Sequence, residues 1–137
     1  TETLGITLER IREETQMSRI LMVDDSPTEI VVAKKALESK GHTVITASNG
    51  ADGVAKAKAE KPDLILMDIV MPDMNGFKAT RTISKDPETA SIPVIIMSSK
   101  DQATDMEWAK RQGATSYLVK PASEEELLAA VEQALGG

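Results

Sequence analysis

The chain has 137 residues and a net charge of −6 at neutral pH, with no cysteine and few aromatic residues. The acidic balance argues against nucleic-acid binding, which needs a basic patch, and the lack of cysteine excludes disulfides and thiolate metal sites. No apolar run approaches the roughly 20 residues of a membrane span. We therefore expect a cytoplasmic protein without membrane insertion, whose core is built from aliphatic side chains.

Residues 1–17 differ in pattern from the rest of the chain. Leu4, Leu8 and Ile11 fall at helical spacing among charged residues, but so short a helix is unstable in water unless it docks on something. Met17 stands just before the first apolar run, where a natural chain start would be placed. We expect residues 1–17 to be an N-terminal extension, either helical or added in cloning, and residues 18–137 to form one domain.

Five short apolar runs then alternate with five segments of helical periodicity. The runs predict strands at 20–23, 42–47, 64–67, 92–97 and 115–119, and the helices are expected at 26–40, 50–61, 77–85, 101–112 and 123–135. Ser-x-x-Glu capping boxes at Ser26 and Ser123 open two of the helices, and Gly41, Pro62 and Gly113 mark helix ends. Strands that alternate with helices predict a parallel sheet covered by helices on both faces.

Polar side chains follow four of the five predicted strands. They are Asp24 with Asp25, Asp68, Ser98 and Lys120. Because the carboxyl ends of parallel strands lie along one edge of the sheet, we expect these side chains to converge. Clustered carboxylates repel one another unless they share a cation, and oxygen ligands of this kind suit Mg²⁺. A lysine and a hydroxyl beside them predict a site where a phosphoryl group is carried on an oxygen nucleophile.

The segments around these residues resemble the response-regulator receiver domain family. The resemblance covers residues 19–136 and is carried by the motifs VDDS (23–26), LMDIVMP (66–72), IMSS (96–99) and YLVKP (117–121). It implies an α/β, flavodoxin-like, doubly wound (βα)5 fold, whose five parallel strands have the order 2-1-3-4-5.

The same resemblance implies a chemical role for each strand-end residue. Asp68 would accept a phosphoryl group from a histidine kinase or a histidine phosphotransfer domain, and Lys120 would pair with the phosphoryl oxygens. The Lys120–Pro121 peptide bond is typically cis in the family. The Mg²⁺ ligands would be Asp24, Asp25, Asp68 and the backbone carbonyl of Val70.

Two further residues would transmit the modification to a binding surface. In the family, the hydroxyl of Ser98 turns toward the phosphoryl group and Tyr117 changes its rotamer. This would remodel the face made by the helix at 101–112, the strand at 115–119 and the helix from residue 123. That face would bind a downstream protein, and the protein would be a monomer or a weak dimer that pairs through the same face. The candidate partner-surface residues are Trp108, Lys110 and Arg111.

Loop motifs narrow the resemblance further. The segment Asp24–Glu29, the Asn75-Gly76-Phe77 turn and the Trp108–Ala114 segment are similar to PilH-like single-domain regulators, which act in the chemotaxis-like pathway of type IV pilus twitching motility. The resemblance therefore implies a stand-alone phosphorylation switch.

Alternative functions remain open. The protein could be a phosphate sink or a scaffold that does not need phosphorylation. A phosphohydrolase with Asp68 as nucleophile would require a general acid soon after it, and Val70, two positions beyond, does not supply one. We therefore expect no enzymatic activity beyond self-catalysed phosphorylation and dephosphorylation of Asp68.

Overall fold

The computed structural model of the chain describes residues 18–69 and 75–136. The predicted extension at 1–17 and the carbonyl of Val70 lie outside these residues. Strands and helices alternate in the described part, each within a few residues of its expected position. They are β1 (Arg19–Val23), α2 (Pro27–Glu38), β2 (Thr43–Ala47), α3 (Gly50–Glu60), β3 (Leu64–Asp68), α4 (Gly76–Lys85), β4 (Val94–Ser98), α5 (Ala103–Arg111), β5 (Ser116–Val119) and α6 (Glu124–Ala134).

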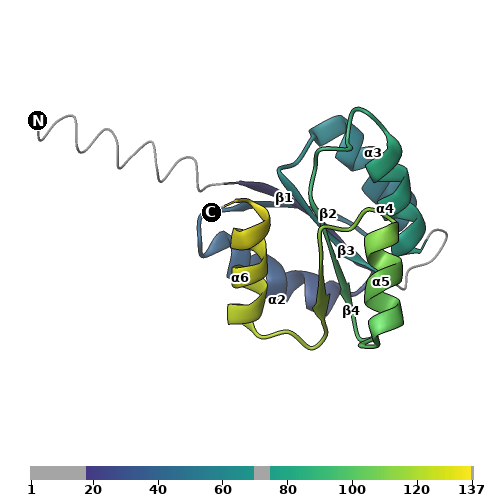
Figure 1. The fold of residues 1–137 in the computed structure, drawn as a ribbon. Coiled ribbons are helices and arrows are strands. Elements are labelled where there is room, and N and C mark those ends of the chain that lie inside the picture. The colour runs from purple at the N-terminus through teal and green to yellow at the C-terminus, as the bar shows by residue number, and fades with distance from the viewer. Residues whose placement is uncertain (1–17, 70–74, 137) are drawn as a thin grey trace, which may run out of the picture.

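The five strands form one parallel sheet in the order β2-β1-β3-β4-β5, which confirms the expected topology (Figure 1). β1 and β3 occupy the interior of the sheet, and the register places Val23 opposite Met67. Farther along the sheet, Asp68 lies opposite Met97 and Ser98 lies opposite Val119. The carboxyl ends of these strands therefore meet at a common edge, as the sequence predicted.

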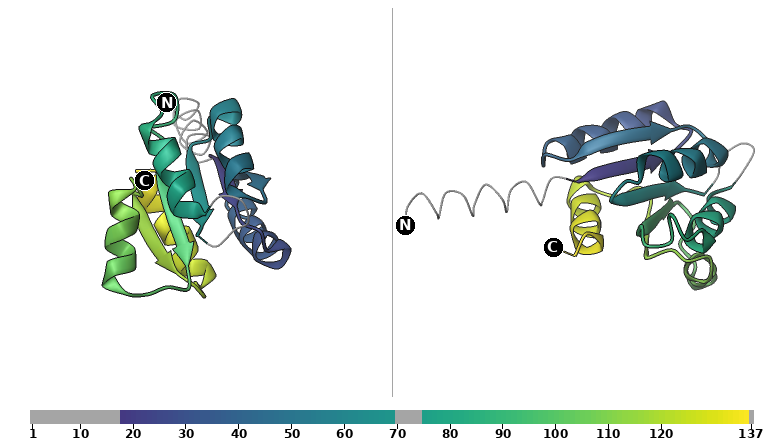
Figure 2. Two further views of the ribbon diagram at one scale, coloured as in Figure 1. Left: turned by 90° about the vertical axis from the view of Figure 1, so that its right-hand side faces the viewer. Right: turned by 90° about the horizontal axis from the view of Figure 1, so that it is seen from above.

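Helices cover both faces of the sheet. Helices α2 and α6 pack on one face, and α3, α4 and α5 pack on the other (Figures 1 and 2). Strand β3 shows why its sequence is apolar throughout: Leu64 and Leu66 join the core under α2 and α6, whereas Ile65 and Met67 join the core on the opposite face. A strand buried on both faces needs no alternation of polar residues. Among the described residues, no helix has the length and apolar character to span a bilayer.

One of the two predicted capping boxes forms completely. At α6, the Ser123 hydroxyl accepts the Glu126 amide, and the Glu126 carboxylate accepts the Ser123 amide. At α2, the Ser26 hydroxyl accepts the Glu29 amide at 3.3 Å, but the Ser26 amide donates to Asp24 Oδ1 at 2.9 Å. The prediction of a reciprocal box at Ser26 is therefore wrong, because a neighbouring carboxylate takes the amide that Glu29 would have bound.

Gly76 lies against the backbone of Asp68. Its amide donates to the carbonyl of Ile69 at 2.9 Å, and a Cβ atom at this position would collide with the carbonyl of Asp68. The first residue of α4 and the last residue of β3 can approach so closely only because position 76 has no side chain.

Replacing this glycine tests the close approach. We expect Gly76→Ala to lower the free energy of unfolding by about 1–3 kcal/mol, the usual cost of overpacking, in urea denaturation. Arg81→Ala is a suitable control, because it places an alanine at an exposed position of the same helix. Equal losses in the two variants would contradict the role given to Gly76.

Candidate functional site

The structure brings the predicted strand-end side chains together. Asp24 follows β1, Asp68 ends β3, Ser98 ends β4 and Lys120 follows β5. One carboxylate oxygen from each of Asp24, Asp25 and Asp68 lies within 4.8 Å of the other two. Three acidic residues from two strands of the sheet thus share one small volume.

Lys120 pairs with two of the three aspartates of this acidic cluster. Its Nζ lies 3.2 Å from Asp24 Oδ2 and 3.2 Å from Asp68 Oδ1. It also donates to Glu29 Oε2, in the first turn of α2, at 2.6 Å. The Lys120–Pro121 peptide bond is cis, as expected.

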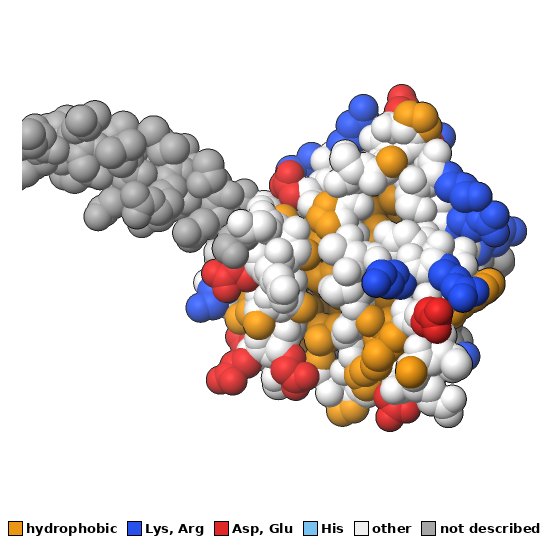
Figure 3. Space-filling model, viewed as in Figure 1, with side chains coloured by type: hydrophobic (Ala, Val, Ile, Leu, Met, Phe, Trp, Pro, Cys, Tyr) orange, Lys and Arg blue, Asp and Glu red, His pale blue; other side chains and the backbone are white. Residues whose placement is uncertain are grey.

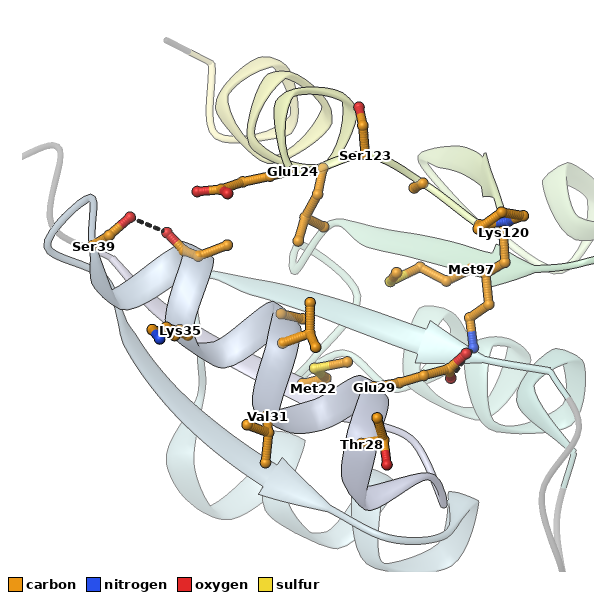
Figure 4. Close-up of a pocket in the computed structure, with 16 residues that line it drawn as sticks. Met22, Thr28, Glu29, Val31, Lys35, Ser39, Met97, Lys120, Ser123 and Glu124 are labelled. Atoms are coloured by element: carbon orange, nitrogen blue, oxygen red, sulfur yellow. Dashed lines mark hydrogen bonds and ion pairs between the residues drawn. The ribbon is translucent and has the colours of Figure 1, made fainter.

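Sequence reasoning missed Glu29 as a site residue and assigned it only to a helix cap. Its position was nevertheless informative, because it lies four residues after Asp25, in the first turn of a helix that starts at the site. Glu29 and Lys120 line a groove of about 730 Å³ between α2 and α6. Figure 4 shows their side chains meeting at one end of this groove.

Burial is the largest influence on the pKa values of Asp24 and Asp68. Asp24 is only 1% exposed, and burial raises its pKa to about 6, although the Ser26 amide and the charge of Lys120 act in the opposite direction. Burial also raises the pKa of Asp68 against the effect of Lys120. The pKa of Glu29 is lowered, chiefly by its hydrogen bond to Lys120.

The pKa of Lys120 is raised although its side chain is largely buried. Burial alone would lower this pKa, but the hydrogen bond to Glu29 and the charges of Asp24 and Asp68 outweigh the burial. Lys120 therefore remains an ammonium and a permanent donor for anions at the site.

The donor set of the acidic cluster fits Mg²⁺. Asp24, Asp25 and Asp68 offer hard oxygen ligands, and Asp25 is exposed, so that water molecules can complete the coordination. The raised pKa values of Asp24 and Asp68 show that the negative charges at this place are poorly compensated, and a divalent cation would compensate them.

The two predicted switch residues bind the same residue. Ser98 is 3% exposed, and its Oγ accepts the Lys100 amide at 3.1 Å. The Tyr117 hydroxyl donates to the Lys100 carbonyl at 2.9 Å. The loop after β4 is therefore held by one hydrogen bond to the site and one to β5, a connection that spacing in the sequence did not reveal.

The predicted partner-surface residues lie on α5, away from the acidic cluster. Trp108 is 50% exposed, and both Lys110 and Arg111 are exposed. Figure 3 shows that Lys and Arg side chains gather on the side of α4 and α5, while Asp and Glu side chains gather over α6. Helix α5 itself carries Asp105 and Glu107 beside Lys110 and Arg111, so its formal charge is zero although the chain as a whole is acidic.

The sequence and the fold of this chain are similar to those of known proteins. The response regulator receiver domain model matches residues 20–132. The chain is 59% identical over 121 residues to Protein PilH of Pseudomonas aeruginosa, an alignment that covers 88% of this chain and 100% of PilH. The structure of chemotaxis protein CheY4 of Vibrio cholerae has a TM-score of 0.82 and 30% identity, and the match covers 86% of this chain and 98% of CheY4.

A second solved structure bears on the metal. The receiver domain of a Pseudomonas aeruginosa sensor histidine kinase was solved with a magnesium ion coordinated in its active site cleft. It has a TM-score of 0.81 and 30% identity, and the match covers 88% of this chain and 99% of that domain.

The raised pKa of Asp24 predicts a pH-dependent stability. Between the ordinary value of 3.8 and about 6, the folded chain binds more protons at Asp24 than the unfolded chain. Stability therefore falls as the pH rises through this window, and the cost is complete above pH 6. In EDTA, Asp24→Asn should raise the free energy of unfolding by about 1–2 kcal/mol near pH 7.5 and by much less near pH 4.5.

Urea denaturation at the two pH values measures this difference. Asp25→Asn serves as the control, because it removes the same charge from an exposed position next to Asp24. A loss of stability in Asp24→Asn at both pH values would show that burial does not penalise the charge of Asp24.

Proposed function

Because this chain belongs to the response regulator receiver domain family, we propose that it is a switch in which Asp68 accepts a phosphoryl group. The observation that carries the proposal is the position of Lys120 Nζ, 3.2 Å from both Asp68 and Asp24 at the edge where the acidic cluster lies. A buried carboxylate beside a fixed ammonium combines a nucleophile with a group that binds the incoming anion.

The reaction is a transfer from a phosphohistidine of a histidine kinase or phosphotransfer domain. A carboxylate oxygen of Asp68 attacks phosphorus and forms a new oxygen–phosphorus bond, while the bond from phosphorus to the imidazole nitrogen breaks and the histidine leaves. Asp24 and Asp25 would hold Mg²⁺ together with Asp68, and the bound ion would neutralise charge on the phosphoryl oxygens. Lys120 donates a charge-assisted hydrogen bond to one of these oxygens.

The output of the switch runs through Ser98. When its hydroxyl turns to a phosphoryl oxygen, the Lys100 amide loses its acceptor, and the Lys100 carbonyl that binds Tyr117 moves with the same residue. The change reaches the face made by α5, β5 and α6, where Trp108, Lys110 and Arg111 are available to a downstream protein or a second copy. A new dianion thus biases a surface between two states.

The chain is a response regulator of a chemotaxis-like pathway, an assignment that its similarity to PilH and to chemotaxis protein CheY4 supports. We infer that the pathway controls type IV pilus twitching motility, as the loop motifs predicted. The similarity to PilH supports this inference, because it extends over the full length of that protein.

The acceptor can be identified by mass. After incubation with acetyl phosphate and Mg²⁺, we expect the intact chain to gain one phosphoryl group, and Asp68→Asn and EDTA-treated samples to gain none. Asp101→Asn, which makes the same substitution at an exposed position, should be labelled like the wild type. No adduct on the wild type, under conditions that label another receiver domain, would contradict the switch and favour a scaffold that does not need phosphorylation.

The remodelling of the output face can be followed by fluorescence. Trp108 is the only tryptophan and lies on α5, so its emission reports on the proposed face without a label. Adding beryllofluoride, a phosphoryl mimic, with Mg²⁺ should change the intensity or maximum of this emission. The change should disappear in Ser98→Ala, although that variant still binds the mimic in calorimetry. If the emission of Ser98→Ala changes as in the wild type, Ser98 does not transmit the modification to this face.

A further inference from the structure

Glu29 has no role in the proposed transfer, yet it makes the shortest contact of Lys120. Its Oε2 lies 2.6 Å from Lys120 Nζ, whereas both aspartate oxygens lie at 3.2 Å. Figure 4 shows the two side chains reaching toward each other from α2 and from the end of β5. The Glu29 side chain is 46% exposed and that of Lys120 is 16% exposed, so the pair lies at the rim of the site.

The local sequence explains why Glu29 is available for this contact. In a complete capping box its carboxylate would bind the Ser26 amide, but Asp24 Oδ1 accepts that amide at 2.9 Å. The Glu29 carboxylate is thereby free to turn to Lys120, and the low pKa that results keeps it charged. The Glu29 carboxylate, which would otherwise cap the helix, is therefore an additional anion at the site.

The hydrogen bonds of Lys120 are fully used in this arrangement. An ammonium has three donors, and Asp24, Glu29 and Asp68 each accept one. A phosphoryl group on Asp68 adds oxygens that need the same donors and carries negative charge toward the Glu29 carboxylate. One acceptor must therefore give way, and Glu29 is the most exposed of the three and is not among the proposed metal ligands.

We propose that Glu29 is a positioning residue that competes with the phosphoryl group for Lys120 and so weakens the affinity of the site for that group. The inference rests on the proposed function, because it concerns the same Lys120. The Glu29–Lys120 pair holds the ammonium toward α2 in the unmodified protein, and it opens when a phosphoryl oxygen takes over the donor.

Beryllofluoride binding tests the competition directly. With saturating Mg²⁺, calorimetry should give a dissociation constant for beryllofluoride about three- to fivefold lower for Glu29→Gln than for the wild type, because an exposed charge pair contributes up to about 1 kcal/mol, which corresponds to about fivefold. Glu38→Gln is the matched control: it removes the same charge from an exposed position on the same helix, and it should bind like the wild type. Glu29→Ala, which also removes the acceptor, should behave like Glu29→Gln.

A second titration separates positioning from damage to the fold. With Mg²⁺ alone, Glu29→Gln should bind the ion equally or more weakly, because Lys120 then pairs more strongly with the aspartates. Tighter binding of the anion together with no gain for the cation is a pattern that a loosened α2 would not produce, since a distorted site would lose both ligands.

The possible results distinguish a failure of the Glu29 competition from a failure of the proposed phosphoryl-accepting function. If the wild type does not bind beryllofluoride with Mg²⁺, the proposed function fails and the inference fails with it. If the wild type binds but Glu29→Gln and Glu29→Ala bind equally or more weakly, the function stands and the competition is refuted.

Discussion

The site depends on one ammonium group among carboxylates that burial has separated from water. Taking Asp24 and Asp68 out of water raises the free energy of their charged forms, and Lys120 offsets only part of this cost, because the pKa values of both aspartates stay above their ordinary range. The unmodified protein therefore holds a site with excess negative charge. Such a site favours a divalent cation, and in the proposed function this ion and Lys120 together would compensate the charge of a phosphoryl group.

The sheet keeps these like charges together. Ile65, Met67 and Ile96 are completely buried under α3, α4 and α5, and Leu66 and Ile95 are buried on the other face. A close-packed interior resists small displacements, so the strand ends cannot move apart to relieve the repulsion. The aliphatic core thus holds the carboxylates close together despite their repulsion, and removing a site carboxylate should be tolerated by the fold.

The sequence predicts features that depend on the order of the strands, but not those that depend on a competition between individual hydrogen bonds. The strand order and the meeting of Asp68, Ser98 and Lys120 were predictable, because apolar runs of similar length and family motifs determine which residues end on the same edge. The contact of Glu29 with Lys120 was not, because it depends on a competition for the Ser26 amide that spacing alone leaves open. The shared binding of Lys100 by Ser98 and Tyr117 likewise requires coordinates.

The close approach of Gly76 to the Asp68 carbonyl also decides which parts of the molecule can respond to modification. Because the start of α4 touches the backbone of Asp68 and donates a hydrogen bond to Ile69, this end of the helix has little room to move relative to Asp68. The loop at Lys100 is held to Ser98 and Tyr117 by single hydrogen bonds, so it is mechanically the softer neighbour. If Asp68 accepts a phosphoryl group as proposed, we therefore expect the loop at Lys100, next to α5, to respond more readily than the start of α4.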